Sequence, residues 1–247
     1  MNYVKLFIYS FILLAIAFVI IKIVKKNVHD QRTLDKIFII GALTTLLLHY
    51  SSMFVDFANG NYYIEDNMFL PVYPCNVMMW INVLLCFLII KKGPLFSTFS
   101  TISFYLGTGC GLIGLCFNKN FLNNPFLNDY DILKGLLSHA AMIFTSYYLG
   151  AFNYVRIKTF SNLKDLIIGM IILALCSAVS DKILVAIGRE AVNGMLLTPL
   201  SDYPIANFYM ISLAALIVFI VVTSIYEGIV YKDNAWYKTI ARKDNDA

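Results

Sequence analysis

Long apolar runs dominate this sequence of 247 residues and decide what the chain can fold into. A helix needs about 20 mostly apolar residues to cross the roughly 30 Å hydrocarbon core of a bilayer. Seven segments meet this requirement, and only short polar connections separate them. The sequence therefore predicts an all-α, polytopic membrane protein that forms a bundle of seven transmembrane helices. The spans are expected near residues 6–23, 37–55, 70–90, 99–117, 132–152, 166–187 and 206–230.

The composition agrees with this fold class. Hydrophobic residues make up 60% of the chain and charged residues only 14%, whereas a soluble domain has about 25% charged residues. Because no connection is long enough to hold a soluble domain, we expect one transmembrane domain over residues 1–230 and a short cytoplasmic tail over 231–247. The first apolar run is not expected to be a cleaved signal peptide, because Lys22, Lys25 and Lys26 follow it rather than precede it.

The basic residues predict the orientation of the chain. Cytoplasmic loops of membrane proteins carry an excess of Lys and Arg. With seven spans and the N-terminus outside, 14 of the 19 basic residues fall on the inner side, which places the C-terminus inside. This cytoplasmic collar also explains the net charge of +4, so we expect a cell-membrane, multi-pass protein without a nucleic-acid partner. The basic residues left outside are Lys5, Lys119, Lys134, Lys182 and Arg189.

Polar and ionisable side chains inside the expected spans mark the candidate site. A charge at the centre of a transmembrane helix costs about 2.5–3.5 kcal/mol on insertion scales, so such residues are commonly functional. In the predicted topology His49, Cys75 and His139 lie at one depth, roughly 7–12 Å below the outer boundary at the helical rise per residue. The remaining polar candidates are Asp56, Asn76, Asn82, Asp181 and Lys182.

Helical spacing places these groups on single faces. Three spans carry polar residues at intervals of three or four, which puts each set on one stripe of its helix. A fourth span presents a smooth face that lets a neighbouring helix or an acyl chain approach closely. We therefore expect a polar pocket that opens toward the outer leaflet. The stripes are Thr45, His49, Ser52 and Asp56; Cys75, Met79, Asn82 and Cys86; Gly135, His139, Met142 and Ser146; and Ser103, Gly107, Gly111 and Gly114.

The segment LPVYPC predicts a helix that begins within the membrane. Proline is favoured at the first helical position because its missing N–H costs nothing there. If Pro74 takes that position, the N–H groups of Cys75 and Asn76 lack intrahelical partners and point outward at the positive end of the helix dipole. That end favours a thiolate and can receive an oxyanion, with the Asn76 side chain as a further donor. His139 is the candidate base, and His49 is expected to orient it or to bind substrate.

Four segments in order along the chain, LPVYPC, YLGTGCGLIG, LLSHAAMI and NGMLLTP, resemble the YwaF family of bacterial integral membrane proteins. That family is related to the animal transmembrane ether-phospholipid acyltransferase. The resemblance implies a Cys–His acyltransferase, with Cys75 as the nucleophile and His139 as the histidine of the family. It also matches Asn193 to an asparagine ahead of the last span. The family usually has a histidine where this chain has Tyr73, so any role of that histidine is either lost or passed to Tyr73 or His49.

The leading hypothesis is acyl transfer between phospholipids. Cys75 would form a thioester, His139 would act as general base, and phospholipid and lysophospholipid would be the partners, with no cofactor. A small-solute or lipid transporter without covalent chemistry is the alternative. In that case Asp56, Asn82 and Asp181 would line the pocket and bind an ion or an amine.

A seven-helix receptor or sensor is a third hypothesis. A retinal protein is excluded because the last expected span contains no lysine, whereas a haem held by His49 and His139 is geometrically allowed. The five cysteines follow no metal-binding spacing, so we expect no metal site. A disulfide between Cys75 and Cys110 stays open at this point and would remove the free nucleophile.

Overall fold

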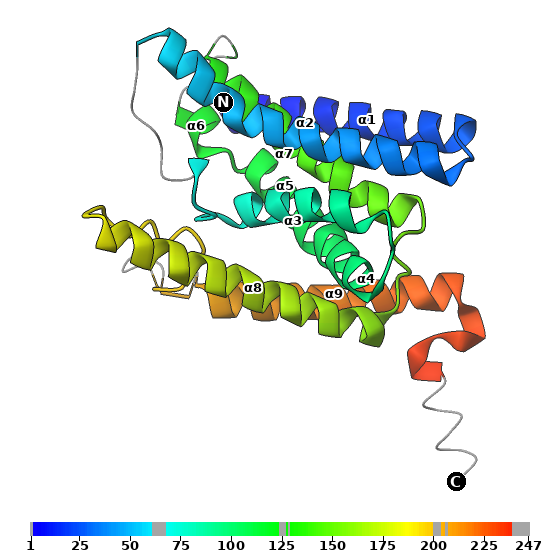
Figure 1. The fold of residues 1–247 in the computed structure, drawn as a ribbon. Coiled ribbons are helices and arrows are strands. Elements are labelled where there is room, and N and C mark those ends of the chain that lie inside the picture. Colours follow the sequence, from blue (N-terminus) through cyan, green and yellow to red (C-terminus); the bar gives the residue numbers. More distant parts are fainter. Residues whose placement is uncertain are drawn as a thin grey trace. The chain divides into compact units, whose positions relative to one another are not determined.

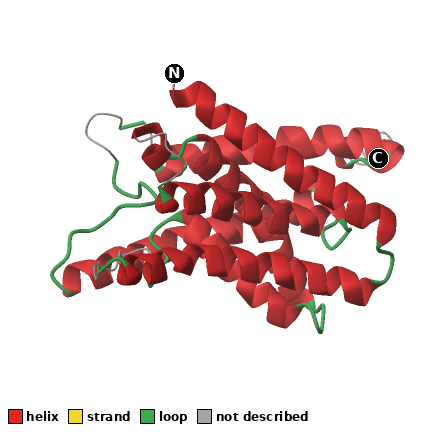
Figure 2. Ribbon diagram, turned by 90° about the horizontal axis from the view of Figure 1, so that it is seen from above, coloured by secondary structure: helices red, strands yellow, loops and turns green. Residues whose placement is uncertain are grey.

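A computed structural model of the protein describes residues 2–60, 68–123, 127, 129–199, 204–205 and 207–238. Within these ranges every regular element is helical and no strand occurs, which confirms the all-α prediction (Figure 2). The chain divides into two compact units, Met1–Tyr154 and Val155–Ala247.

Among the described residues, most helices belong to the first unit, and the second contains two long helices and a short turn (Figure 1). The elements of the first unit are α1 (Asn2–Asn27), α2 (Gln31–Ala58), α3 (Pro74–Leu88), α4 (Pro94–Ile102), the π-helical η2 (Ser103–Gly107), α5 (Thr108–Cys116), α6 (Lys119–Asn123) and α7 (Tyr130–Ala151). The elements of the second unit are α8 (Thr159–Ala186), α9 (Phe208–Val230) and the 3₁₀ turn η3 (Lys232–Asn234).

Five helical stretches of the described chain are long and apolar enough to cross a membrane, so the protein is a polytopic helical membrane protein. Two predicted spans fall outside this set. α3 is apolar but has only 15 residues, which at about 1.5 Å per residue is shorter than a bilayer core. α7 has 22 residues but carries polar side chains along its length. The five stretches are Asn2–Asn27, Gln31–Ala58, Pro94–Asn123, Thr159–Ala186 and Phe208–Val230.

Local sequence signals explain where several helices begin. The Asp30 carboxylate accepts the N–H of Thr33 and caps α2, and this bond lowers the pKa of Asp30. Asp129 caps α7 and Asn207 caps α9 in the same way, because their side chains accept N–H groups of the first turn. Proline occupies the first turn of both α3 and α4.

α2 and α7 lie side by side and run antiparallel. Near the end of α2 and the start of α7, the Tyr130 hydroxyl donates to Ser51 Oγ at 2.7 Å. Near the start of α2 and the end of α7, the Tyr148 hydroxyl donates to the Leu34 carbonyl at 3.0 Å. Between these bonds Gly41 of α2 faces α7 so closely that an added Cβ would lie 2.9 Å from Thr145 Oγ1. The two helices are therefore in contact along their shared length.

A carboxylate fixes one end of this helix pair. Asp35 of α2 accepts the Tyr154 hydroxyl at 2.6 Å and the Gln31 side-chain amide at 2.9 Å, and it pairs with Lys92 Nζ at 3.0 Å. Burial, and after it the Asp35 carboxylate, raises the pKa of Tyr154 well above its ordinary value, so its hydroxyl remains a donor at physiological pH. The contact joins the α3–α4 connection and the end of α7 to α2.

An apolar cluster fixes the opposite end, where α1 packs against α5, α6 and α7. Two hydrogen bonds flank it: the Asn2 side chain donates to the Leu122 carbonyl at 2.9 Å and Ser10 Oγ to the Leu115 carbonyl at 3.1 Å. Burial of such apolar side chains stabilises the packing at about 25 cal/mol per Å² removed from water in a soluble reference. The buried members are Leu6, Leu115, Phe121, Ile132, Leu136 and Ile143.

In the second unit a buried carboxylate joins three segments. Glu227, in the last turn of α9, is 1% exposed. It accepts the N–H of Thr159, the first residue of α8, and the N–H of Trp236 at 3.3 Å. The Trp236 indole donates to Ser224 Oγ at 2.8 Å. The beginning of the expected cytoplasmic tail therefore packs against α9.

Replacing Glu227 with alanine tests this arrangement. Glu227→Ala removes the acceptor of two N–H groups, and a buried donor without a partner costs about 1–3 kcal/mol. We expect the free energy of unfolding of the second unit to fall by that amount. Thermal unfolding in detergent, followed by Trp236 fluorescence in a Trp80→Phe background, measures it. Glu190→Ala, at an exposed position, should change stability by less than about 0.5 kcal/mol; equal effects of the two substitutions would contradict the assignment.

Candidate functional site

The helix that carries Cys75 begins at Pro74, as predicted from LPVYPC. Tyr73 is its N-cap, with an extended backbone (φ −110°, ψ 152°), and Pro74 occupies the first turn. A residue before proline avoids the helical conformation, which explains the extended entry. The helix therefore starts four residues later than the expected span at residue 70, and Cys75 lies in its first turn.

One part of that prediction is wrong. The N–H of Asn76 donates to the Tyr73 carbonyl at 3.0 Å, and the N–H of Val77 donates to the same oxygen at 3.3 Å. The Asn76 backbone is therefore engaged in the first turn of the helix, because the cap carbonyl lies within reach of both amides. Of the two N–H groups assigned to an oxyanion, only that of Cys75 precedes the first intrahelical bonds.

Cys75 is half-buried. Its helix, α3, packs against α5, which carries a second thiol, Cys110, in its first turn. Both are free thiols in this structure, so the disulfide left open by the sequence is not formed. Cys75 therefore keeps the free sulfur that a nucleophile requires.

His49 lies next to the same helix start. Its Nε2 is 3.5 Å from Asn76 Nδ2, a long hydrogen bond in which the amide donates to the ring nitrogen. Its ring also packs edge-on against Tyr50, with centroids 5.1 Å apart. The contact brings His49 close to the start of α3, which carries Cys75. His49 thus holds the Asn76 amide at this helix start.

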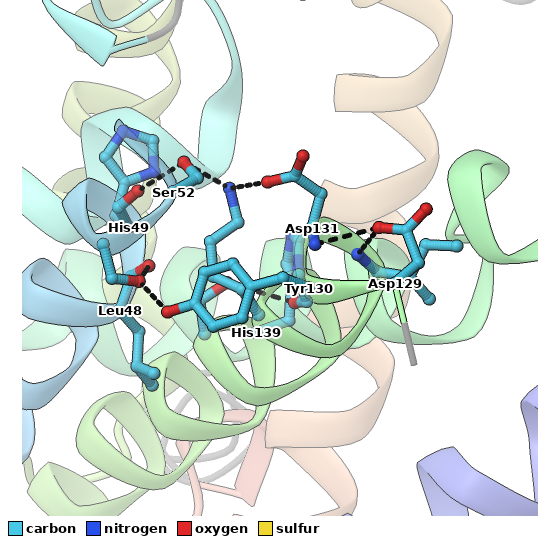
Figure 3. Close-up of polar contacts among 12 residues, drawn as sticks. Leu48, His49, Ser52, Asp129, Tyr130, Asp131 and His139 are labelled. Carbon is cyan, nitrogen blue, oxygen red and sulfur yellow. Dashed lines mark hydrogen bonds and ion pairs between the residues drawn. The ribbon is translucent and has the colours of Figure 1, made fainter. Parts of the chain in front are cut away.

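His139 has the geometry of a base with one nitrogen available. Its Nδ1 lies 2.6 Å from the Gly135 carbonyl, one turn earlier in α7 (Figure 3). Because a carbonyl oxygen only accepts hydrogen bonds, Nδ1 carries the proton, and Nε2 of the neutral ring keeps its lone pair. The ring lies against Gly114 of α5, where an added Cβ would overlap Cδ2 and Nε2.

α5 contacts both of the helices that carry the candidate catalytic groups, α3 with Cys75 and α7 with His139. Cys110 and Gly114 are four residues apart, so they share a face of α5 and are separated by about 6 Å along the helix axis. The His139 ring of α7 lies on Gly114. The structure records no hydrogen bond between Cys75 and His139. Nucleophile and base often come within hydrogen-bonding distance only when substrate is bound.

The glycine face predicted for the fourth span is used by a helix. Each of three glycines in η2 and α5 lies so close to a side chain of α7 that a methyl group would not fit. The smooth face therefore accommodates α7 rather than an acyl chain. The contacts are Gly107 with Ser146, Gly111 with Ile143 and Gly114 with His139.

Asn82 stabilises the bundle from a fully buried position. Its side-chain oxygen accepts the Ser103 hydroxyl and its amide donates to Ser146 Oγ at 3.3 Å. Ser103 Oγ and Ser146 Oγ are also hydrogen-bonded at 3.1 Å, and all three residues are 0% exposed. This cluster joins α3, η2 and α7, which gives Asn82 a supporting role. Tyr73, in contrast, is 39% exposed.

Asp181 and Asn193 come together in the second unit. Asp181 Oδ1 accepts the N–H groups of Val192 and Asn193 at 2.9 and 3.2 Å. The Asn193 side chain donates to the Thr198 carbonyl at 2.7 Å and accepts the Thr198 N–H at 3.1 Å. The two residues that were predicted as site residues therefore shape the connection between α8 and α9.

A polar contact that the sequence analysis missed lies where α2 meets the start of α7. Lys134 Nζ donates to Ser52 Oγ at 3.0 Å and lies 3.6 Å from Asp131 Oδ1 (Figure 3). Ser52 in turn donates to the His49 carbonyl at 3.5 Å. The sequence analysis counted Lys134 only as an outer basic residue. Its position five residues before His139 was the available signal.

A sequence profile of the TMEM164 family matches residues 2–226, which include most of both units. The chain belongs to the TMEM164 family. Membership of this membrane-protein family and the five long apolar helices together show a multi-pass membrane protein. Searches of curated proteins and of solved structures gave no match.

Two glycines of α5 provide a matched test of the site's packing. An added Cβ at Gly114 overlaps the His139 ring, whereas Gly109 has open space around an added Cβ. Gly114→Ala should lower the free energy of unfolding by about 1–3 kcal/mol through overpacking. Gly109→Ala should raise it by up to about 1 kcal/mol, because alanine is the better helix former. Unfolding of the two variants in detergent checks the difference, and changes of the same sign and size would contradict the placement of His139.

Proposed function

We propose that the protein transfers acyl chains between membrane phospholipids, with Cys75 as nucleophile and the Nε2 atom of His139 as general base. The observation that carries the proposal is the arrangement along α5. A free thiol lies at the start of α3, which contacts α5, and an imidazole with one unprotonated nitrogen lies on Gly114 of α5. A thiol and an adjacent base form the arrangement used in acyl transfer.

The first half of the reaction forms a thioester. His139 Nε2 takes the thiol proton, and Cys75 Sγ attacks the ester carbonyl carbon of a phospholipid. The positive end of the α3 dipole and the Cys75 N–H stabilise the oxyanion of the tetrahedral intermediate, with the Asn76 amide held nearby by His49. The carbon–oxygen bond to the glycerol then breaks, and the departing alkoxide takes the proton from His139 as a lysophospholipid.

The second half returns the enzyme to its starting state. His139 Nε2 accepts the proton of an acceptor hydroxyl, whose oxygen attacks the thioester carbonyl. The carbon–sulfur bond breaks, the new ester forms, and the proton passes from His139 to the Cys75 sulfur. The membrane supplies both lipids.

Acyl exchange in liposomes tests these roles. Cys75→Ala should abolish exchange of acyl chains followed by mass spectrometry, and His139→Gln should slow it by about 10²–10⁴-fold, the usual contribution of a general base. Intact-mass measurement of the wild type should show an acyl adduct that is absent from Cys75→Ala. Cys116→Ala serves as the control, because it removes a half-buried thiol of α5 that has no role in the proposed reaction. Undiminished exchange by Cys75→Ala would overturn the mechanism.

We also propose that the chain crosses the membrane seven times, with the N-terminus outside and the C-terminus inside. Alternation of the first unit's helices supports this topology. α2 and α7 run antiparallel, and α3 runs opposite to α2, because His49 lies beside Asn76 while Asp35 pairs with Lys92. The excess of basic residues on the predicted inner side supports the orientation.

Cysteine labelling in intact cells tests the topology. In a background without native cysteines, Asn2→Cys and Lys238→Cys place single thiols before the first span and after the last. A membrane-impermeant maleimide added outside should label the first variant only, and the second should become labelled after the cells are opened. Labelling of both positions in intact cells would show an even number of spans.

A further inference from the structure

Lys134 has a largely buried, charged side chain, and its carboxylate partner makes only a long contact with it. Its side chain is 13% exposed, and its ammonium group donates to Ser52 Oγ at 3.0 Å. Its carboxylate partner, Asp131, is 3.6 Å away and has a side chain that is 51% exposed. A buried ammonium needs an anion with good geometry. Asp131 supplies only a long contact from an exposed position, which is weaker than the contact of an anion at hydrogen-bonding distance.

The Lys134 ammonium lies nearer than the candidate catalytic groups to the end of the bundle where α2 ends and α7 begins. Ser52 follows His49 by three residues in α2, and Lys134 precedes His139 by five residues in α7. Because the two helices are antiparallel, both steps lead toward the same end of the bundle. The layer of Ser52 and Lys134 is therefore roughly 4–8 Å beyond that of His49 and His139, at about 1.5 Å per residue.

That spacing matches a glycerophospholipid bound with its ester at Cys75. The phosphate of such a lipid is separated from the ester carbon nearest to it by a few bonds, a distance comparable with one helical turn of about 5.4 Å. Lysine binds phosphate as a point charge. A serine hydroxyl beside the ammonium adds a further hydrogen-bonding group.

We infer that Lys134 and Ser52 bind the phosphate of the phospholipid substrate, and that this contact selects phosphate-bearing lipids over neutral acylglycerols. The inference rests on the proposed function, since it assigns the substrate's polar group to the same site. Asp131 is the counterion that the phosphate displaces. Lys134 thereby places the ester beside Cys75 and defines which lipids react.

Binding to a catalytically inactive protein tests the inference without turnover. The full-length Cys75→Ala protein in detergent is titrated with short-chain phosphatidylglycerol and, in parallel, with short-chain diacylglycerol, and native mass spectrometry counts the bound lipid. Adding Lys134→Gln should weaken phosphatidylglycerol binding about tenfold or more, the usual effect of losing a hydrogen bond to a charged group. Binding of diacylglycerol should be unchanged.

Three further variants keep the test decisive. Asp131→Asn leaves the ammonium in place and removes its competitor, so it should tighten phosphatidylglycerol binding. Lys134→Arg should retain part of the affinity, and Lys5→Gln, which removes an exposed charge from α1, should change nothing. Equal weakening of both lipids by Lys134→Gln, or weaker binding in Asp131→Asn, would overturn the phosphate assignment.

A final arm separates the source of the phosphate and the two proposals. Inorganic phosphate at millimolar concentration should not displace phosphatidylglycerol, because the acyl chains contribute to binding; full displacement would mean a site for free phosphate and would overturn the lipid assignment. If lipid binding depends on Lys134 but the wild type shows no acyl exchange, the proposed reaction fails while the phosphate site stands. If the wild type exchanges acyl chains but lipid binding does not depend on Lys134, the phosphate assignment fails while the proposed reaction stands.

Discussion

The antiparallel contact between α2 and α7 is the constraint on which the rest of the first unit depends. The helices are hydrogen-bonded near both ends, and Gly41 lets them approach closely between these bonds. Because the facing sides of α2 and α7 are then fixed against each other, groups far apart in sequence are held at matched heights. α3 and α5 are positioned against this pair, so the candidate site inherits its geometry from it.

This arrangement separates the polar groups of the bundle along the helix axes. His49 and His139 lie at one height, with Cys75 at the start of the neighbouring α3, and the ammonium of Lys134 lies nearer one end of the helix pair. A further group, formed around Asn82, is buried and joins three helices. The residues proposed for catalysis and for substrate binding thus lie at different heights from those that join the helices, although all are polar residues within apolar segments.

The sequence predicted those features that depend on local pattern. Apolar runs located the long helices, and Pro74 located the start of α3, because both signals act within a few residues. The contacts of Glu227 and Lys134 were not predicted from the sequence, since their partners are far away along the chain. Thr159 lies 68 positions from Glu227, and Ser52 lies 82 positions from Lys134. Asp181 and Asn193 were predicted as site residues, and the structure shows them hydrogen-bonded within the connection that follows α8. Polarity inside a span can therefore be read from sequence, whereas its purpose depends on tertiary partners.

The π-helical turn Ser103–Gly107 has a consequence for how α5 meets its neighbours. A π turn contains one residue more than the α-helical path would, and one residue corresponds to about 100° of rotation about the helix axis. Everything after Gly107 is thereby turned relative to α4. With a regular helix in its place, Gly114 would point in a different direction from the one that now meets His139. A single extra residue thus sets the rotation of the α5 face against which the imidazole packs.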